Sequence, residues 1–343
     1  MRCIVDIETN GLIKEATTVH CIVAADIDTG QSYVFKQAEC YTAFPVWAKQ
    51  VQKFIMHNGI SFDAPVVNKL IGKTINLNSV TDTLILSQLY NPTREGGHSL
   101  KEWGDKLSLP KEEINDFSQF TEAMLDYCKQ DINITYKLYK QLEAEGRNFS
   151  SRSVKLEHAI RAAIDVQESN GFALDMPYAM TLQGKFEDES DQIQRELQEI
   201  FEPIVTIRHH KTSGKRLSDH VEVFNPASRK QIAERLMAKG WNPKHKTEKG
   251  NIIVDESVLE KIDMPEAKAI TRYLLLQKRS SQIKSWIEAA GEDGRVHGRV
   301  LTLKTVTGRM AHYAPNMAQV PASYSPYGEE CRNCWTVSNK DLI

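Results

Sequence analysis

Short apolar runs alternate with helical patterns over the first 150 residues of the chain. Apolar strands are predicted at residues 3–5, 19–25, 33–35 and 54–56. Helices are predicted at residues 44–52, 62–70, 100–107 behind the N-cap Ser99, and 120–145. Residues 84–89 form an apolar run that fits either a helix or a strand. Strands that alternate with helices predict an α/β domain.

The pattern changes after the polar segment 145–151, where we expect a domain boundary. Helices are predicted beyond it at residues 154–169, 177–200, 229–239, 255–261 and 266–290. Residues 201–224 are interpreted as a short basic connection. Beyond Gly294 the sequence predicts short strands and turns, so the second half is mostly helical with a strand-rich end.

Composition narrows the class of protein. The 343 residues are 41% hydrophobic and 26% charged, which supports a packed core and excludes wholesale disorder. No apolar run approaches the ~18 residues of a membrane span, and an acidic residue interrupts the start of the chain before a signal peptide could form. The six scattered cysteines do not resemble a disulfide framework, and we expect Cys331 and Cys334 to be ordinary thiols. We therefore expect a cytoplasmic, non-secreted protein.

Charge is distributed unevenly along the chain. Residues 1–150 hold 15 Lys and Arg against 19 Asp and Glu, whereas residues 208–249 hold 11 against 4. An acidic half beside a basic segment favours a metal site next to a surface that binds a polyanion. An unevenly charged, solvated surface is the alternative.

The candidate chemistry lies in carboxylates on predicted elements. Asp6 and Glu8 are two residues apart at the end of a strand, so both side chains leave the same face. Asp63 stands near the start of a helix, and Tyr127 and Asp131 are four apart on one helix face. Each feature has a structural alternative: exposed acids at a strand end, an acid that stabilises a helix N-terminus, or a tyrosine packed beside a solvated aspartate.

Taken together, the order, type and spacing of these residues resemble DEDDy-type 3′–5′ exonucleases. The pattern is Asp-x-Glu on a first strand, Asn-x-x-x-Phe-Asp from Asn58 to Asp63, and Tyr-x-x-x-Asp on a late helix. The resemblance implies a ribonuclease H-like fold. Hydrolysis of a phosphodiester by two hard cations explains the residue types, because Mg²⁺, with Mn²⁺ as a substitute, prefers oxygen ligands. The expected metal ligands are Asp6, Glu8, Asp63 and Asp131, and Tyr127 would position the attacking water. Asp82 resembles a further acid of the fold and is given no direct metal role.

The second half resembles family A (DNA polymerase I-like) DNA polymerases. The motifs are Thr307-Gly308-Arg309, then Pro315-Asn316 to Gln319, and Asn225-Pro226-Ala227-Ser228 before a helix. This resemblance implies an exonuclease domain at 1–147 and the N-terminal part of a polymerase domain at 148–343. The thumb would cover about 178–290 and a partial palm about 150–177 and 291–343. The expected DNA-binding residues are Asn58, Asn225, Ser228, Arg229, Lys230, Thr307, Arg309, Asn316 and Gln319.

Short phage replicative polymerases are the members that this chain resembles most, so a phage gene expressed in a host cell is expected. The family's later palm acids and fingers helix are not found within the 343 residues. We therefore expect a split polymerase in which a second polypeptide docks on unfinished strands at 334–337 and 342–343, with a truncated piece as the competing explanation. The segment 201–224 is too short for a thioredoxin-recruiting insertion, so no thioredoxin partner is predicted.

The motifs and the charge distribution leave three candidate functions. The first is a proofreading 3′–5′ DNA exonuclease that also binds the primer–template of a replicative polymerase. The second is a DNA clamp or scaffold for a separate catalytic chain. The third is a stand-alone DEDDy ribonuclease, against which the motifs of residues 151–343 argue.

Overall fold

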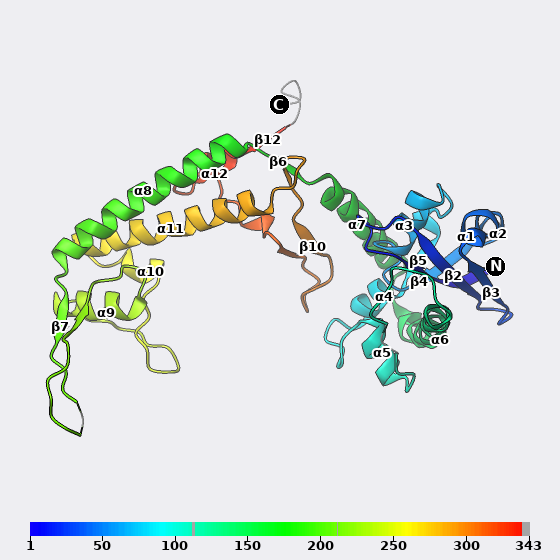
Figure 1. Ribbon diagram of the computed structural model, residues 1–343, viewed down its shortest axis with the longest axis horizontal. Helices are drawn as coiled ribbons and strands as arrows, with labels where there is room; N and C mark the ends of the chain where they lie inside the picture. Colours follow the sequence, from blue (N-terminus) through cyan, green and yellow to red (C-terminus); the bar gives the residue numbers. More distant parts are fainter. Residues whose placement is uncertain (112–113, 211, 338–343) are drawn as a thin grey trace. The chain divides into compact units, whose positions relative to one another are not determined.

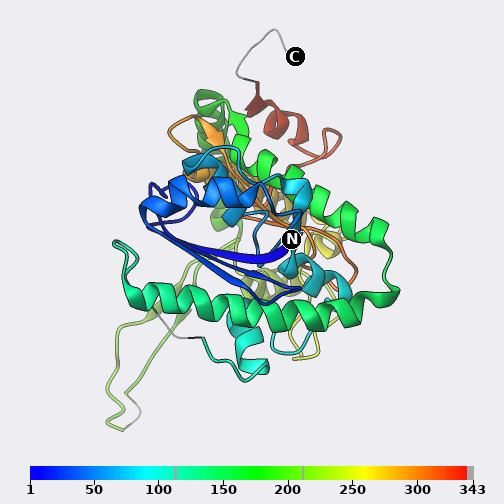
Figure 2. The ribbon, with the colours of Figure 1, turned by 90° about the vertical axis from the view of Figure 1, so that its right-hand side faces the viewer.

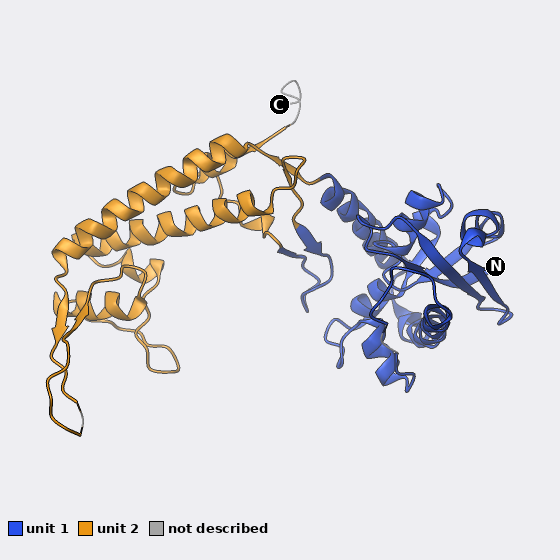
Figure 3. Cartoon of the chain, in the orientation of Figure 1, with its two compact units in different colours: residues 1–170, 299–313 blue, residues 171–298, 314–343 orange. Residues whose placement is uncertain are grey.

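The computed structural model describes residues 1–111, 114–210 and 212–337. It divides into two compact units (Figure 3). Unit 1 consists of Met1–Asn170 and Arg299–Tyr313, and unit 2 of Gly171–Gly298 and the residues from Ala314 onward. No helix in these described ranges is both long and apolar enough to cross a membrane.

A five-stranded mixed sheet forms the centre of unit 1 (Figure 1). Its strand order is β3 (Ser32–Lys36), β2 (Val19–Asp26), β1 (Arg2–Thr9), β4 (Lys53–Met56) and β5 (Val80–Asp82). Strand β1 pairs antiparallel with β2 and parallel with β4. The predicted strands are confirmed, and β5 is an addition whose three residues are too few to give a periodic signal.

Helices cover both faces of this sheet. Cys3, Val5 and Ile7 pack with the side of the sheet that holds α1 (Ala38–Thr42), α2 (Phe44–Ala48) and α3 (Asp63–Leu70). Ile4 packs on the opposite side with α5 (Leu100–Lys106) and α6 (Glu122–Glu145), and Figure 2 shows α6 alongside the strands. The alternation of side chains along β1 therefore feeds two hydrophobic cores.

Two helical expectations are refined in unit 1. The predicted helix at 44–52 ends at Ala48, because Gln50 and Val51 make i→i−3 hydrogen bonds that turn the chain toward β4. The ambiguous run at 84–89 is helix α4 (Thr83–Tyr90), which begins where the Asp82 side chain accepts hydrogen bonds from the helix N-terminus. Short 3₁₀ turns lie at Leu77–Ser79 and Gly146–Asn148.

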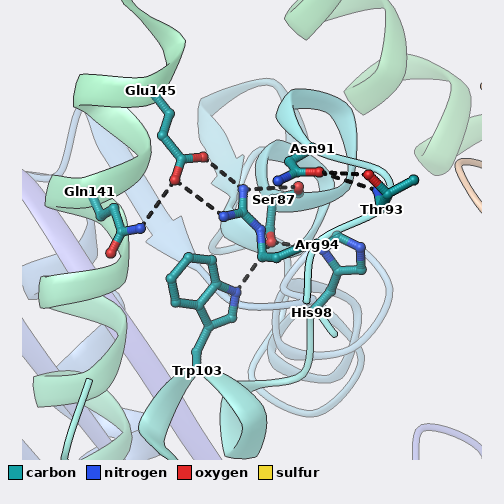
Figure 4. A network of polar contacts seen from close by, with 8 residues as sticks. All are labelled: Ser87, Asn91, Thr93, Arg94, His98, Trp103, Gln141 and Glu145. Carbon is teal, nitrogen blue, oxygen red and sulfur yellow. Dashed lines mark hydrogen bonds and ion pairs between the residues drawn. The ribbon is translucent and has the colours of Figure 1, made fainter. Parts of the chain in front are cut away.

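An ion pair between the buried Arg94 and the more exposed Glu145 closes the loop after α4 onto α6 (Figure 4). Arg94 donates to both Glu145 carboxylate oxygens, at 2.7 and 3.1 Å, and its guanidinium lies 4.7 Å from the centre of the Trp103 ring. Trp103 Nε1 donates to Ser87 Oγ, which is itself 2.8 Å from His98 Nδ1. This network joins α4, α5 and α6 on the same side of the sheet.

Helix α7 (Ser151–Asn170) packs within unit 1 beyond the polar segment 145–151. Arg161 donates to the carbonyl oxygen of Val300 at 2.7 Å, in the strand β10 (Arg299–Leu301) that pairs with β11 (Ala311–Tyr313). Asp165 accepts a 2.8 Å hydrogen bond from Ser61 Oγ. Unit 1 is thus larger than residues 1–147, and the end of the exonuclease domain itself stays a prediction.

Unit 2 is built around two long helices that run side by side, α8 (Met176–Ile200) and α11 (Pro265–Ala289) (Figure 1). Phe186 and Leu197 from α8 and Ile270, Ile283 and Trp286 from α11 are buried in one core. Strand β6 (Phe172–Leu174) pairs with both β12 (Trp335–Thr336) and β9 (Arg295–Val296). The remaining helices are α9 (Arg229–Ala238), α10 (Glu256–Leu259), α12 (Gly328–Asn333) and the 3₁₀ turn Met317–Gln319.

The interpretation of 201–224 as a connection is wrong. Strands β7 (Ile204–Thr206) and β8 (His220–Glu222) form an antiparallel hairpin there. The β-branched residues of β7 favour this structure, but the basic residues between the strands obscure the pattern. Helix α10 is also shorter than the predicted 255–261, and residues 342–343 lie outside the described residues.

Candidate active site

Strand β1 presents two acids to the face of the sheet that α6 covers. Asp6 and Glu8 follow Ile4 at intervals of two, and Ile4 packs in the core that includes Leu125 and Cys128 of α6. Glu8 is only 8% exposed. The alternation along β1 therefore places one buried carboxylate, Glu8, and one half-buried carboxylate, Asp6, beneath the helix.

Helix α6 supplies the next two residues. Thr121 caps its N-terminus, and the helical repeat places Tyr127 and Asp131 on one face. Asp131 is 3% exposed, and its Oδ2 forms an ion pair with Lys111 Nζ. The other oxygen, Asp131 Oδ1, is buried and accepts no hydrogen bond from the described residues. One acceptor at the centre of the site is therefore left for a further donor or a cation.

The turn after β4 positions Asp63, the first residue of α3. Because β4 lies parallel to β1, this turn leaves the sheet at the same edge as Glu8. The buried carboxylate of Asp82 accepts hydrogen bonds from the backbone N–H groups of Asn58 and Ile60, at 3.0 and 3.1 Å. Asn58 adopts a left-handed conformation with φ of 61°. Asp82 thus holds the turn and keeps Asp63 at the sheet edge.

Burial raises the pKa values of all four carboxylates, and the charges of neighbouring acids add to the shift in Asp6, Glu8 and Asp63. Burial, with the charges of Asp131, Glu8 and Asp63, raises the pKa of Asp6 well above its usual range. Burial and Asp131 raise the pKa of Glu8 to about 8, and burial raises that of Asp63 to about 7. Burial also raises the pKa of Asp131, although Lys111 opposes the shift. Burial and neighbouring negative charges thus disfavour the charged forms of these acids, and a bound cation would favour them.

Two residues of this cluster have no counterpart among the sequence predictions. Cys128 Sγ lies 3.3 Å from Asp6 Oδ2, and the ligand atoms of Asp6, Glu8 and Cys128 all lie within 4.8 Å of one another. Helical spacing could have indicated Cys128, which is one turn before Asp131. No sequence pattern indicates Lys111, because it belongs to the irregular segment before α6. Only the tertiary fold brings it close to the acids.

The residues present fit a divalent metal ion. The donors are carboxylate oxygens, which hard cations prefer, and Asp131 Oδ1 is buried without a hydrogen-bond partner among the described residues. Tyr127 is half-buried beside them, with Lys111 Nζ 4.4 Å from its ring centre. The structure therefore brings together Asp6, Glu8, Asp63, Tyr127 and Asp131 as the spacing predicts, while their catalytic roles stay predictions.

The predicted DNA-binding residues fall in both units. Asn58, Thr307 and Arg309 are exposed in unit 1. In unit 2, Ser228 Oγ caps α9, and the side chains of Asn225 and Asn316 accept hydrogen bonds from nearby backbone N–H groups. Arg229, Lys230 and Gln319 are exposed. The polar caps thus have local structural tasks. The two cations at the start of α9 are exposed and chemically suited to phosphate, although Lys230 also forms a 3.9 Å ion pair with Glu234.

A buried group of acids at the edge of a mixed sheet, with a tyrosine one helical turn from the last acid, defines a class of nuclease. Residues 3–147 match the family model described as 3'-5' exonuclease, and residues 186–343 match the model of DNA polymerase family A. The chain carries a 3′–5′ exonuclease domain followed by a portion of a family A DNA polymerase domain. The predicted fold class and the resemblance to family A are confirmed.

Similar proteins include phage and bacterial polymerases. The chain is 27% identical to the DNA-directed DNA polymerases of Escherichia phage T7 and Enterobacteria phage T3, over 95% of this chain and 64% of each relative. It is 27% identical to DNA polymerase I of Helicobacter pylori, over 76% of this chain and 27% of that relative. The chain thus spans less than two thirds of the length of these relatives.

One solved structure has a similar fold. The POL domain of Pol1 from M. smegmatis, in complex with DNA primer-template and dNTP, superposes with a TM-score of 0.72 and 17% identity. The match covers 97% of this chain and 55% of that one. At this identity the likeness concerns the fold.

Proposed function

We propose that this chain is a divalent-cation-dependent 3′–5′ exodeoxyribonuclease that proofreads primer ends, and that it also holds the primer–template for DNA polymerisation. The observation that carries the nuclease proposal is the group of four acids, three buried and Asp6 half-buried, whose pKa values are raised. One of their oxygens, Asp131 Oδ1, is buried without a hydrogen-bond partner among the described residues. Such a group is costly to the fold unless a cation binds there.

Each residue has a definite task in this proposal. Asp6, Glu8, Asp63 and Asp131 would hold Mg²⁺, or Mn²⁺ in its place. The bound cations supply the positive charge that activates water and stabilises the leaving oxygen of the phosphodiester. The Tyr127 hydroxyl orients the attacking water, and Asp82 keeps the turn before Asp63 in place. The expected product is a nucleoside 5′-monophosphate.

The second part of the proposal concerns primer–template DNA. The segment 208–249 holds 11 Lys and Arg against 4 Asp and Glu, and Arg229 and Lys230 are exposed at the start of α9. Lysine and arginine contacts to phosphates would give affinity without sequence preference. In unit 1, the exposed Arg309 would contact the primer terminus. The requirement for a second polypeptide in polymerisation stays a prediction from the sequence.

The basic segment also favours a second candidate, a DNA clamp in which hydrolysis is incidental. Both are tested by incubating the chain with Mg²⁺ and a 3′-mismatched primer–template, and with an RNA of the same sequence. We expect mononucleotide release from DNA, which Asp6→Asn/Glu8→Gln abolishes and Asp126→Asn leaves intact, because Asp126 is an exposed acid on α6. Tight duplex binding without release would favour the clamp, and preferred digestion of the RNA would favour a ribonuclease.

A further inference from the structure

The positively charged ammonium group of Lys111 lies among the carboxylates of the site. Its Nζ forms an ion pair with Asp131 Oδ2 and lies 4.4 Å from the centre of the Tyr127 ring. The side chains of Lys111 and Asp131 are 17% and 5% exposed, so solvent screens the pair only partly. One lysine therefore contacts both the helix residue expected to orient water and the helix residue expected to bind metal.

The charge of Lys111 opposes the binding of a divalent cation. A positive group in contact with Asp131 repels a second positive charge and competes for the same oxygen atoms. A lysine at this position therefore cannot serve by strengthening metal binding. Any favourable contribution of Lys111 to the reaction must come from its contacts with Tyr127 and Asp131.

Those two contacts constrain the site geometrically. A cation over the face of a tyrosine ring is attracted to the ring, and the same ammonium group is held by the carboxylate one helical turn away. Together they fix the direction of the Tyr127 side chain relative to Asp131. Half-buried Tyr127 otherwise has one described aromatic neighbour, Phe117, with ring centres 6.3 Å apart.

We propose that Lys111 is a positioning residue of the exonuclease reaction, which aligns Tyr127 with Asp131 while it weakens the affinity of the site for divalent cations. This inference rests on the proposed nuclease function. It predicts that the loss of Lys111 moves metal affinity and turnover in opposite directions. A residue with a purely structural role would lower both together.

The test compares Lys111→Met with two matched controls. Lys106→Met removes a lysine that lies 4.8 Å from the Trp103 ring, and Lys129→Met removes an exposed lysine from α6. Mn²⁺ binding is measured by calorimetry without DNA, and nucleotide release is measured at saturating Mn²⁺ over a range of DNA concentrations. Thermal unfolding of every variant checks that it is folded.

For Lys111→Met we expect Mn²⁺ to bind more tightly, on the order of tenfold. We expect kcat to fall by about 10- to 100-fold, as for other residues that orient metal ligands, with the KM for DNA nearly unchanged. Both control variants should match the wild type. Ethylammonium added to Lys111→Ala should restore part of the rate, because it returns a cation to the same space.

Two results would overturn the proposal: an unchanged kcat in Lys111→Met, or a loss of Mn²⁺ affinity together with kcat and no rescue of Lys111→Ala by ethylammonium. If Lys111→Met unfolds, the ethylammonium experiment on Lys111→Ala decides whether the proposal holds. Failure of the proposed nuclease function is a separate outcome, because the wild-type chain itself would then release no mononucleotide.

Discussion

The buried Asp82 and the half-buried Asp6 lie near the same sheet edge, but their surroundings predict opposite effects on stability. The Asp82 carboxylate accepts hydrogen bonds from the N–H groups of Asn58, Ile60 and Leu84, at 3.0, 3.1 and 2.9 Å. Asp6 instead faces the charges of Asp131, Glu8 and Asp63. We predict that Asp82→Ala destabilises the fold and that Asp6→Asn, without divalent cations, stabilises it or leaves it unchanged.

The magnitude for Asp82 follows from its hydrogen-bond partners. Alanine removes the N-cap of α4, which costs about 1 kcal/mol. It also leaves the N–H of Ile60, a residue only 1% exposed, without its acceptor, at a cost of about 1–3 kcal/mol. The N–H of the exposed Asn58 can hydrogen-bond to water instead, so its loss of an acceptor adds little to the cost. Burial raises the pKa of Asp82, so removal of its charge offsets part of the loss, and the net destabilisation is about 2–3 kcal/mol.

Urea unfolding of wild type, Asp82→Ala and Asp6→Asn, with Mn²⁺ titrations of each, provides the assay. We expect Asp82→Ala to lower the urea midpoint and to keep measurable Mn²⁺ binding, and Asp6→Asn to keep the midpoint and to lose most Mn²⁺ binding. The reasoning is refuted if Asp82→Ala unfolds like the wild type but binds no Mn²⁺, because Asp82 would then be a ligand and not a support for the turn.

Two further predictions concern charge and stability. The folded-state pKa values of Glu8 and Asp63, about 8 and 7, are raised above those of the unfolded chain, so the folded state binds more protons. Without divalent cations, the free energy of unfolding should therefore fall as pH rises from 5 to 8. Calorimetric scans across that range check this, and added Mg²⁺ should reduce the slope; a flat profile would contradict it. Arg94→Ala should cost about 2–3 kcal/mol, because it leaves Glu145 and the Trp103 face without their buried cation. Arg2→Ala, which breaks an ion pair of side chains 39% and 52% exposed, should cost under about 1 kcal/mol, and equal losses for the two variants would show that burial does not decide the difference.

Much of the fold and the candidate site could be predicted from local patterns. The alternation along β1 predicts a strand and puts Asp6 and Glu8 on one face, and the helical repeat puts Tyr127 with Asp131. These relations need only the geometry of one strand or one helix. The hairpin formed by β7 and β8 is not predicted, because its strands have only three residues each and the basic segment between them obscures the pattern.

Contacts between distant segments had to come from the tertiary structure. Lys111 approaches Asp131 from an irregular segment, Arg161 of α7 binds the carbonyl oxygen of Val300, and Asp82 binds the turn at Asn58. No periodicity links such pairs, since their separation along the chain is unrelated to any helical or strand repeat. The sequence alone thus determined which of the acids share one strand face or one helix face. The packing of segments far apart in the chain decided which cation accompanies them and which buried groups hold them, because only packing brings those atoms within contact distance.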